Sequence, residues 1–309
     1  MTRFTGIIPP LCTPFRDDFT IDVDSLRRHL DVQLDAGVHG VFVLGSSSEV
    51  AFLPDRQRRV VIETAVAHVG GRVPVLAGCI DMTTLRVAEH IRVAEDAGAD
   101  ALVITAPYYT RTHTAEIEQH FRLLHAQASL PIFAYDIPVA VHSKLDREMV
   151  LRLAEDGVLA GLKDSSGDEA GFGALLLGRR ERGLSEFAVF TGSELVVDLA
   201  LQMGADGAVP GLANVDPAGY VTIWDRVRAG DRDLATARRE QDRLMRLYDI
   251  THAAPPERMG RGSAGLGAFK AAMKMRGFID NSVMAPPQLP LNDEELLRIK
   301  GALTEAGLL

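Results

Sequence analysis

The feature that most constrains the fold of this chain is a series of eight short apolar runs separated by longer segments of helical period. None of these runs alternates apolar with polar residues over its whole length. That pattern is typical of parallel β-strands covered on both faces, whereas a strand with one wet face alternates. The runs are GIIPPL from Gly6, VFVL from Val41, VPVLA from Val73, ALVIT from Ala101, PIFAY from Pro131, VLAGLK from Val158, FAVFT from Phe187 and GAVP from Gly207.

The segments between the runs place apolar residues on one stripe of a helix. Val23, Leu26, Leu30 and Leu34 recur at this spacing before Gly37, a residue type that commonly ends a helix. Strand and helix alternating in this way predict a parallel sheet, and eight such units favour closure into a (β/α)8 TIM barrel. An open, doubly wound sheet is the alternative that the pattern leaves.

The strand-like runs stop before the last third of the chain. From there the sequence predicts helices over 215–249, 257–277 and 293–306, with proline-rich breaks between them. We therefore expect two parts, a (β/α)8 barrel over residues 1–214 and a helical C-terminal extension over residues 215–309. A chain of 309 residues is long enough for a barrel with such an appendage.

Charge and composition argue against several kinds of partner. The chain has 33 Lys and Arg against 42 Asp and Glu, a net charge of −9, so nucleic acid and anionic membranes are poor partners. Neither a membrane span of about 18 apolar residues nor a secretion signal is found. Cys12 and Cys79 fit neither a disulfide framework nor a zinc pattern. These features predict a cytoplasmic protein with reduced, buried cysteines.

Two short motifs resemble functional sites but lie in the wrong context. Gly260–Gly265 spells GxGxxG, yet no strand-like run precedes it, as a dinucleotide site requires. Gly45–Glu49 resembles the nucleophile elbow of a serine hydrolase, except that its last residue should be glycine. The nine histidines show no HxH or HExxH spacing, so we expect no metal ion.

Lys163 is the most informative residue at the end of a predicted strand. Catalytic side chains of such barrels lie at the carboxyl ends of the strands. A lysine that ends an apolar strand is costly to bury unless it has a role. Burial favours the neutral amine, which can attack a carbonyl carbon. The alternative is a structural lysine paired with Asp164 or another carboxylate, and the chemistry alone leaves both interpretations open.

Two other strand ends offer groups that suit carbonyl chemistry. Tyr135 ends the run before Lys163, so its hydroxyl is placed to relay protons while a carbinolamine forms and breaks down. The alternative is a tyrosine of the barrel core. Ser46 and Ser47 follow the second run and supply hydroxyls and backbone N–H groups suited to a carboxylate. The alternative there is an ordinary polar loop.

Four motifs, in order along the strand ends, resemble those of the dihydrodipicolinate synthase and N-acetylneuraminate lyase family of class I aldolases. The resemblance covers nearly the whole chain, from Phe4 to Glu305. The family's G-[TS]-T-G-E loop is similar to Gly45–Glu49, its P-Y-Y motif to Pro107–Tyr109, its Y-N-x-P motif to Tyr135–Pro138 and its G-[IVL]-K motif to Gly161–Lys163.

The resemblance implies a role for each of these side chains. Lys163 would form a Schiff base with pyruvate or another 2-keto acid, without a metal or other cofactor. Ser46 and Ser47 would hold the pyruvyl carboxylate. Tyr135 would be the proton shuttle, linked through Ser47 to Tyr109 of a neighbouring subunit, which implies a homodimer or homotetramer. Further substrate contacts are implied for Val209 in the keto-acid pocket, and for Ser165, Ser193 and Glu194 around the distal part of the substrate.

The departures from the family pattern bear mainly on the substrate. Ser47, Ser48 and Asp136 replace the threonine, glycine and asparagine of the motifs. Dihydrodipicolinate synthases carry an arginine two residues after the motif proline, where it binds the carboxylate of aspartate semialdehyde. Ala140 stands at that position here and offers no such cation, and His142 is no clear replacement.

These residues favour a lyase of the aldolase type that cleaves a 2-keto-3-deoxy sugar acid to pyruvate and an aldehyde. One alternative is a dihydrodipicolinate synthase that condenses pyruvate with aspartate semialdehyde, and another is a dehydratase or hydratase-aldolase of the same family. A non-catalytic ligand-binding paralogue would have lost a catalytic group, whereas Lys163, Tyr135, Ser47 and Tyr109 are all present.

Overall fold

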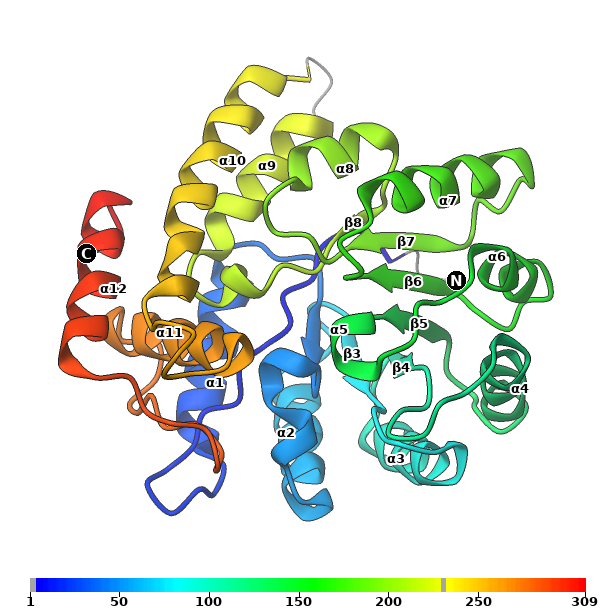
Figure 1. Ribbon diagram of the computed structural model, residues 1–309, viewed down its shortest axis with the longest axis horizontal. Helices are drawn as coiled ribbons and strands as arrows, with labels where there is room; N and C mark the ends of the chain where they lie inside the picture. The colour runs from blue at the N-terminus through cyan, green and yellow to red at the C-terminus, as the bar shows by residue number, and fades with distance from the viewer. Residues whose placement is uncertain (1–3, 229–231) are drawn as a thin grey trace.

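The computed structural model describes residues 4–228 and 232–309, and within them eight parallel strands form a single sheet (Figure 1). Consecutive strands β2 to β8 are neighbours, and β8 pairs with β1. The strands are β1 (Gly6–Ile7), β2 (Val41–Val43), β3 (Val75–Gly78), β4 (Ala101–Thr105), β5 (Ile132–Asp136), β6 (Gly161–Asp164), β7 (Ala188–Thr191) and β8 (Gly207–Ala208). Each lies within, or one residue beyond, an apolar run from which it was predicted.

The sheet closes between β2 and the residues that follow β1. Pro10 forms an isolated parallel bridge with Phe42. The Leu11 N–H donates to the Phe42 carbonyl at 2.8 Å, and the Phe42 N–H donates to the Pro9 carbonyl at 2.9 Å. These bonds join the two ends of the strand order, so the (β/α)8 barrel is confirmed and the open, doubly wound alternative is wrong.

Helices follow the strands and cover the outside of the barrel (Figure 1). In α1 the Asp22 side chain caps the first turn, and Leu26 and Leu30 of the predicted stripe are buried. The helices are α1 (Val23–Asp35), α2 (Asp55–Val69), α3 (Thr84–Ala97), α4 (Thr114–His125), α5 (Pro138–Val141), α6 (Arg147–Glu155), α7 (Glu169–Glu181), α8 (Val197–Met203) and α9 (Pro217–Arg228). Short 3₁₀ helices η1 (Ser46–Ser48), η2 (Val50–Phe52) and η3 (Gly211–Asn214) follow β2 and β8.

Three further helices complete the C-terminal part, α10 (Leu234–Tyr248), α11 (Arg261–Met275) and α12 (Asp293–Glu305), with the 3₁₀ helix η4 (Asp249–His252) after α10. The helix predicted over 215–249 is therefore described as α9 and α10, and residues 229–231 of that prediction lie outside the described residues. Buried side chains of these helices, such as Leu244, Met273 and Ile299, join the same apolar core as the barrel. The division into a barrel over 1–214 and an extension over 215–309 stays a proposal.

Two other sequence features have a plain place in the fold. Cys12 and Cys79 are buried free thiols, as predicted, and burial raises the pKa of the Cys12 thiol to about 12. Through residues 4–228 and 232–309, none of the helices has the length and apolar character needed to traverse a lipid bilayer.

The register of the strands decides which side chains meet inside the barrel. Tyr135 of β5 is the Cα partner of Lys163 of β6, and Lys163 is the partner of Phe190 of β7. Register partners of parallel strands project from the same face of a sheet, and successive residues along a strand project from opposite faces. Tyr135, Lys163 and Phe190 therefore share the inner face, near the carboxyl end of the barrel.

Candidate active site

Lys163 lies inside the barrel against two aromatic rings. It is only 6% exposed, and its Nζ lies 4.1 Å from the ring centre of Tyr135 and 5.0 Å from that of Phe42. The two rings enclose the end of the Lys163 side chain and keep bulk water away from it. Asp164 projects from the other face of the strand, so the amine of Lys163 is presented to the barrel interior.

Tyr135 supplies one wall of this amine pocket and brings a hydroxyl to it. The residue is 3% exposed, and its ring meets the ring of Phe42 edge-on at a centroid distance of 6.3 Å. Because the ring is packed, the phenol group has a defined place beside the Lys163 side chain. The structure thus brings together the two groups that the sequence predicted to act as amine and proton relay.

The loop after β2 presents two serines and hides a third. Ser46 is exposed and Ser47 is half-buried, so both hydroxyls are available at the carboxyl end of the barrel. Ser48 is buried, and its hydroxyl donates to the Leu11 carbonyl at 2.5 Å. The Thr13 hydroxyl in turn donates to the Ser48 carbonyl at 2.9 Å. The serine that replaces the motif glycine therefore binds the barrel wall rather than narrowing the pocket.

A buried ion pair anchors the same loop to the C-terminal helices. The Glu49 carboxylate contacts the Lys270 ammonium of α11, and both side chains are fully buried. Glu49 also accepts from the Ala285 N–H at 2.7 Å and from the Gln288 amide at 2.6 Å. Burial lowers the pKa of Lys270, although the Glu49 carboxylate opposes the shift. The sequence analysis missed this anchor, and its only signal is a lysine within an apolar helix.

Glu194 follows β7 and places its carboxyl group in an enclosed position. The residue as a whole is partly exposed, but its Oε2 accepts from the Leu212 N–H, and Gly211 lies close beside its Oε1. Burial raises the pKa of Glu194 to about 7, against the opposing effects of these backbone N–H groups and of the Lys163 charge. Near neutral pH the group therefore exists in both protonation states. It can accept a hydrogen bond from a hydroxyl when ionised and donate one to a hydroxyl when protonated.

Replacement of this carboxyl by an amide should change how stability depends on pH. With a raised pKa in the folded state, Glu194 stabilises the fold fully at acid pH, and this contribution is lost as pH rises through about 7. Glu194→Gln keeps the acceptor for the Leu212 N–H but carries no carboxyl group that must ionise. Above pH 7 we therefore expect its free energy of unfolding to exceed that of the unmodified protein, on the order of 3 kcal/mol at most. Denaturant unfolding from pH 5 to 8 measures the difference.

The exposed Glu186 offers a matched control on the segment before β7. Glu186→Gln should show no difference from the unmodified protein that varies with pH. A Glu194→Gln protein whose stability follows the same pH curve as the unmodified protein would mean that Glu194 is ionised throughout.

The remaining predicted substrate contacts gather after β6, β7 and β8. Ser165 is half-buried, and a Cβ added to Gly192 would lie 1.9 Å from its Oγ, so glycine is required for this close approach. The Ser193 N–H donates to Thr191 Oγ1 at 3.0 Å, which fixes the turn after β7. Val209 is buried, 5% exposed, directly after β8. Ser165 and Ser193 thus lie at neighbouring strand ends beside Glu194.

Tyr109 differs from the other predicted residues because its own chain leaves it uncovered. It is 88% exposed, and its backbone is left-handed with φ 76°. It lies in the segment between β4 and α4, where its side chain is open to solvent. In a single chain the structure does not bury Tyr109 in the pocket of Lys163.

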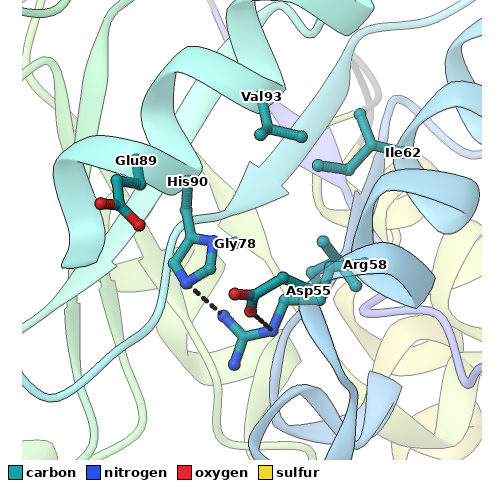
Figure 2. A pocket seen from close by; sticks show the side chains of 8 residues that line it. Asp55, Arg58, Ile62, Gly78, Glu89, His90 and Val93 are labelled. Atoms are coloured by element: carbon teal, nitrogen blue, oxygen red, sulfur yellow. Dashed lines mark hydrogen bonds and ion pairs between the residues drawn. The ribbon is translucent and has the colours of Figure 1, made fainter.

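A separate pocket of about 190 Å³ lies on the outside of the barrel between α2 and α3 (Figure 2). Arg58 lines this pocket and is 7% exposed. Its guanidinium donates to the carbonyls of Val50 and Ile80 and lies 2.8 Å from His90 Nε2. These bonds tie α2 to the segments after β2 and β3. Arg58 is therefore a structural clamp, and the pocket lies outside the barrel wall that encloses Lys163.

The placement of Lys163 and Tyr135 in the barrel agrees with a comparison of the chain with families of known proteins. The model of the "Dihydrodipicolinate synthetase family" matches residues 3–306. The chain belongs to this family. It is accordingly a lyase of the class I aldolase type, as the sequence analysis concluded.

Individual relatives carry two kinds of name. An uncharacterized DapA-like lyase of Halobacterium salinarum is 34% identical over 98% of this chain and 94% of its own. A 4-hydroxy-tetrahydrodipicolinate synthase of Methanoculleus marisnigri is 35% identical over 74% of this chain and 78% of its own. The names therefore agree on the family and differ on the reaction.

Solved structures agree on the fold over the whole length. A prophage protein of the dihydrodipicolinic acid synthase family from E. coli K12, solved in complex with pyruvate, superposes with a TM-score of 0.91 at 27% identity, covering 99% of both chains. A dihydrodipicolinate synthase of Bacteroides thetaiotaomicron superposes with a TM-score of 0.90 at 30% identity, covering 99% of this chain and 100% of its own. A family member with this fold thus binds pyruvate.

Proposed function

We propose that this protein is a Schiff-base aldolase that cleaves a 2-keto-3-deoxy sugar acid to pyruvate and an aldehyde. The observation that carries the proposal is the placement of the Lys163 amine inside the barrel, 4.1 Å from the ring of Tyr135. An amine in this enclosure attacks the C2 carbonyl of a 2-keto acid and loses water to form an iminium ion. The reaction needs no metal ion or other cofactor.

The other side chains have roles that follow the course of the reaction. Tyr135 relays the protons that carbinolamine formation and breakdown require. The iminium then accepts the electron pair of the breaking C3–C4 bond while Tyr135 takes the proton of the C4 hydroxyl, and C4 leaves as the aldehyde. The enamine that remains takes up a proton at C3, and water hydrolyses the resulting iminium to release pyruvate and the Lys163 amine. Ser46 and Ser47 hold the carboxylate of the keto acid, and Val209 lines the same pocket.

The exposure of Tyr109 supports a site shared between subunits. We propose that Tyr109 of one chain reaches the site of another through Ser47, in a cytoplasmic homodimer or homotetramer. A tyrosine that is 88% exposed in its own chain is free to pack against a second copy.

The choice of substrate depends on the cations near the loop after β5. Ala140 is exposed on α5 and carries no charge. Lys144, a few residues later, contacts the carboxylate of Asp136, on the outer face of the sheet. A carboxylate on the second substrate would therefore lack a bidentate cation at this position. Ser165, Ser193 and Glu194 offer groups suited to hydroxyls instead.

A comparison of two substrate classes tests this choice. We expect measurable cleavage of hydroxylated 2-keto-3-deoxy acids and weak or no condensation of pyruvate with aspartate semialdehyde, because an unpaired buried anion is costly. The measurement is kcat/KM for both classes on the unmodified protein. Ala140→Arg should raise condensation with aspartate semialdehyde, since it restores a fork-shaped cation after the motif proline.

The synthase is the second candidate, since relatives such as that of Methanoculleus marisnigri carry its name. A preference for aspartate semialdehyde of more than about a hundredfold, near 2.7 kcal/mol of transition-state binding, would replace the sugar-acid proposal by the synthase. Formation of a dehydrated keto acid without pyruvate release would point to a dehydratase of the same family.

A further inference from the structure

Two buried carboxylates lie directly behind the reactive pair. Asp136 and Asp164 each follow one of the two residues Tyr135 and Lys163, and they are themselves Cα partners on β5 and β6. Their side chains are 0% and 6% exposed. Because successive residues alternate between faces, both carboxylates project toward the helix layer while the tyrosine and the lysine amine project into the barrel. Two like charges held this close repel one another unless a cation separates them.

Lys144 supplies that cation from the segment between α5 and α6. Its ammonium contacts Asp136 Oδ2 and lies 3.8 Å from Asp164 Oδ2. The Leu145 N–H also donates to Asp136 Oδ1 at 3.2 Å, so the segment is bound at two consecutive residues. The Ser166 N–H donates to Asp164 Oδ1 at 2.8 Å.

The charges of this group depend strongly on one another. Burial raises the pKa of Asp136, and the charge of Asp164 adds to this effect, whereas the bond to Lys144 opposes it. Burial alone would lower the pKa of Lys144, but the two carboxylates outweigh it and raise the pKa. A cavity of about 420 Å³ adjoins the group, and its other charged side chains are Asp146, Arg147 and Asp168.

We propose that Lys144 is a positioning residue that fastens the carboxyl ends of β5 and β6 together and offsets one of the two negative charges behind Tyr135 and Lys163. The inference rests on the proposed Schiff-base function. It also explains the departure at position 136, where the family motif has asparagine. A neutral asparagine needs no counter-ion, whereas Asp136 requires Lys144. The two residues therefore act as one unit, fixing the distance between the reactive amine and the phenol on the other face.

Reductive trapping of pyruvate tests the role of Lys144 without knowledge of the natural substrate. The rate of borohydride-trapped adduct formation is measured by mass spectrometry across a range of pH. In Lys144→Met the two carboxylates repel each other, and we expect trapping to slow on the order of 10- to 100-fold, the loss that a small displacement of reacting groups produces. The negative charge left without a counter-ion disfavours loss of a proton from the site, so the midpoint of the pH–rate curve should move to higher pH.

Two further variants separate positioning from simple loss of structure. Asp136→Asn keeps the acceptor for the Leu145 N–H and removes the charge, so trapping by Asp136→Asn/Lys144→Met should recover to within about fivefold of Asp136→Asn alone. Arg147→Met removes a cation from the same cavity, where Arg147 pairs with Glu148 at 3.3 Å. It should trap pyruvate at the rate and pH midpoint of the unmodified protein.

The outcomes separate this inference from the proposed function. No trapped adduct on the unmodified protein would remove the Schiff-base function itself. Normal trapping by both the unmodified protein and Lys144→Met, with the same pH midpoint, would overturn the positioning role alone. A double variant that traps no faster than Lys144→Met, or that fails to fold where Asp136→Asn folds, would also overturn it, because Lys144 would then act independently of the Asp136 charge.

Discussion

Incubation with pyruvate and borohydride should add one reduced pyruvyl group to each chain, at Lys163, and Lys163→Ala should acquire none. The enclosed amine of Lys163 is the nucleophile of the proposed reaction, and alanine offers no group to replace it. We therefore expect Lys163→Ala to lose cleavage of any 2-keto acid substrate down to the detection limit. Intact mass, peptide mapping of the adduct and pyruvate release measure the three parts of this result.

The other buried or paired lysines provide an internal control. Lys270 is fully buried against Glu49, and Lys144 is bound to Asp136, so neither should carry the adduct. Cleavage by Lys163→Ala at a rate near that of the unmodified protein would disprove the covalent mechanism. An adduct mapped to Lys144 or Lys270 would place the amine of the reaction elsewhere.

The barrel could be predicted because its determinants are local in the sequence. Parallel strands covered on both faces are short continuous apolar runs, and the helices between them keep their own period, so eight repeats identify the architecture. Closure was predicted from the number of units, but the bonds that close the barrel were not. Closure depends on Pro10 meeting Phe42, in a segment where the proline-rich run GIIPPL forms a strand of only two residues. Proline lacks the N–H that a regular ladder needs, so a single bridge and its flanking bonds close the barrel.

The candidate site could be predicted where a side chain owes its place to the end of its own strand. Lys163 and Tyr135 end consecutive strands, and parallel register brings such ends together. Pairs that join distant segments were not predictable in this way. Glu49 and Lys270 are 221 positions apart in the chain, and their contact depends on where α11 packs. Asp136 and Lys144 are close in sequence, but the intervening α5 determines that the lysine turns back to the outer face of the sheet.

The structure also changes how two departures from the family motifs are understood. Ser48 replaces the motif glycine, and its hydroxyl bonds to the Leu11 carbonyl in the barrel wall. Asp136 replaces the motif asparagine, and the strand directs its carboxylate outward to Lys144. Both departures are therefore accommodated behind the site, while the inner face keeps the aromatic enclosure of Lys163.

Tyr135→Phe should retain the fold and lose turnover on the order of 10²- to 10⁴-fold, the range for a positioned acid–base group. Phenylalanine keeps the ring that packs against Phe42 and faces Lys163 Nζ, so only the hydroxyl is removed. If that hydroxyl relays protons, kcat should fall while KM changes little, because the enclosure that binds the keto acid is intact. Thermal unfolding checks the fold, and steady-state cleavage separates kcat from KM.

A second tyrosine supplies the matched control for loss of a hydroxyl. Tyr108 is half-buried after β4, and Tyr108→Phe should stay within about twofold of the unmodified protein in kcat. The dependence of kcat on pH is a second measurement, which a change in packing alone would not alter. Removal of the relay should flatten the limb of this profile that depends on proton transfer. A Tyr135→Phe protein that loses less than about tenfold in kcat and keeps the unmodified profile would show that Tyr135 serves the site only as a wall of the amine pocket. Proton transfer would then fall to solvent or to the enclosed carboxyl of Glu194, whose pKa burial raises to about 7.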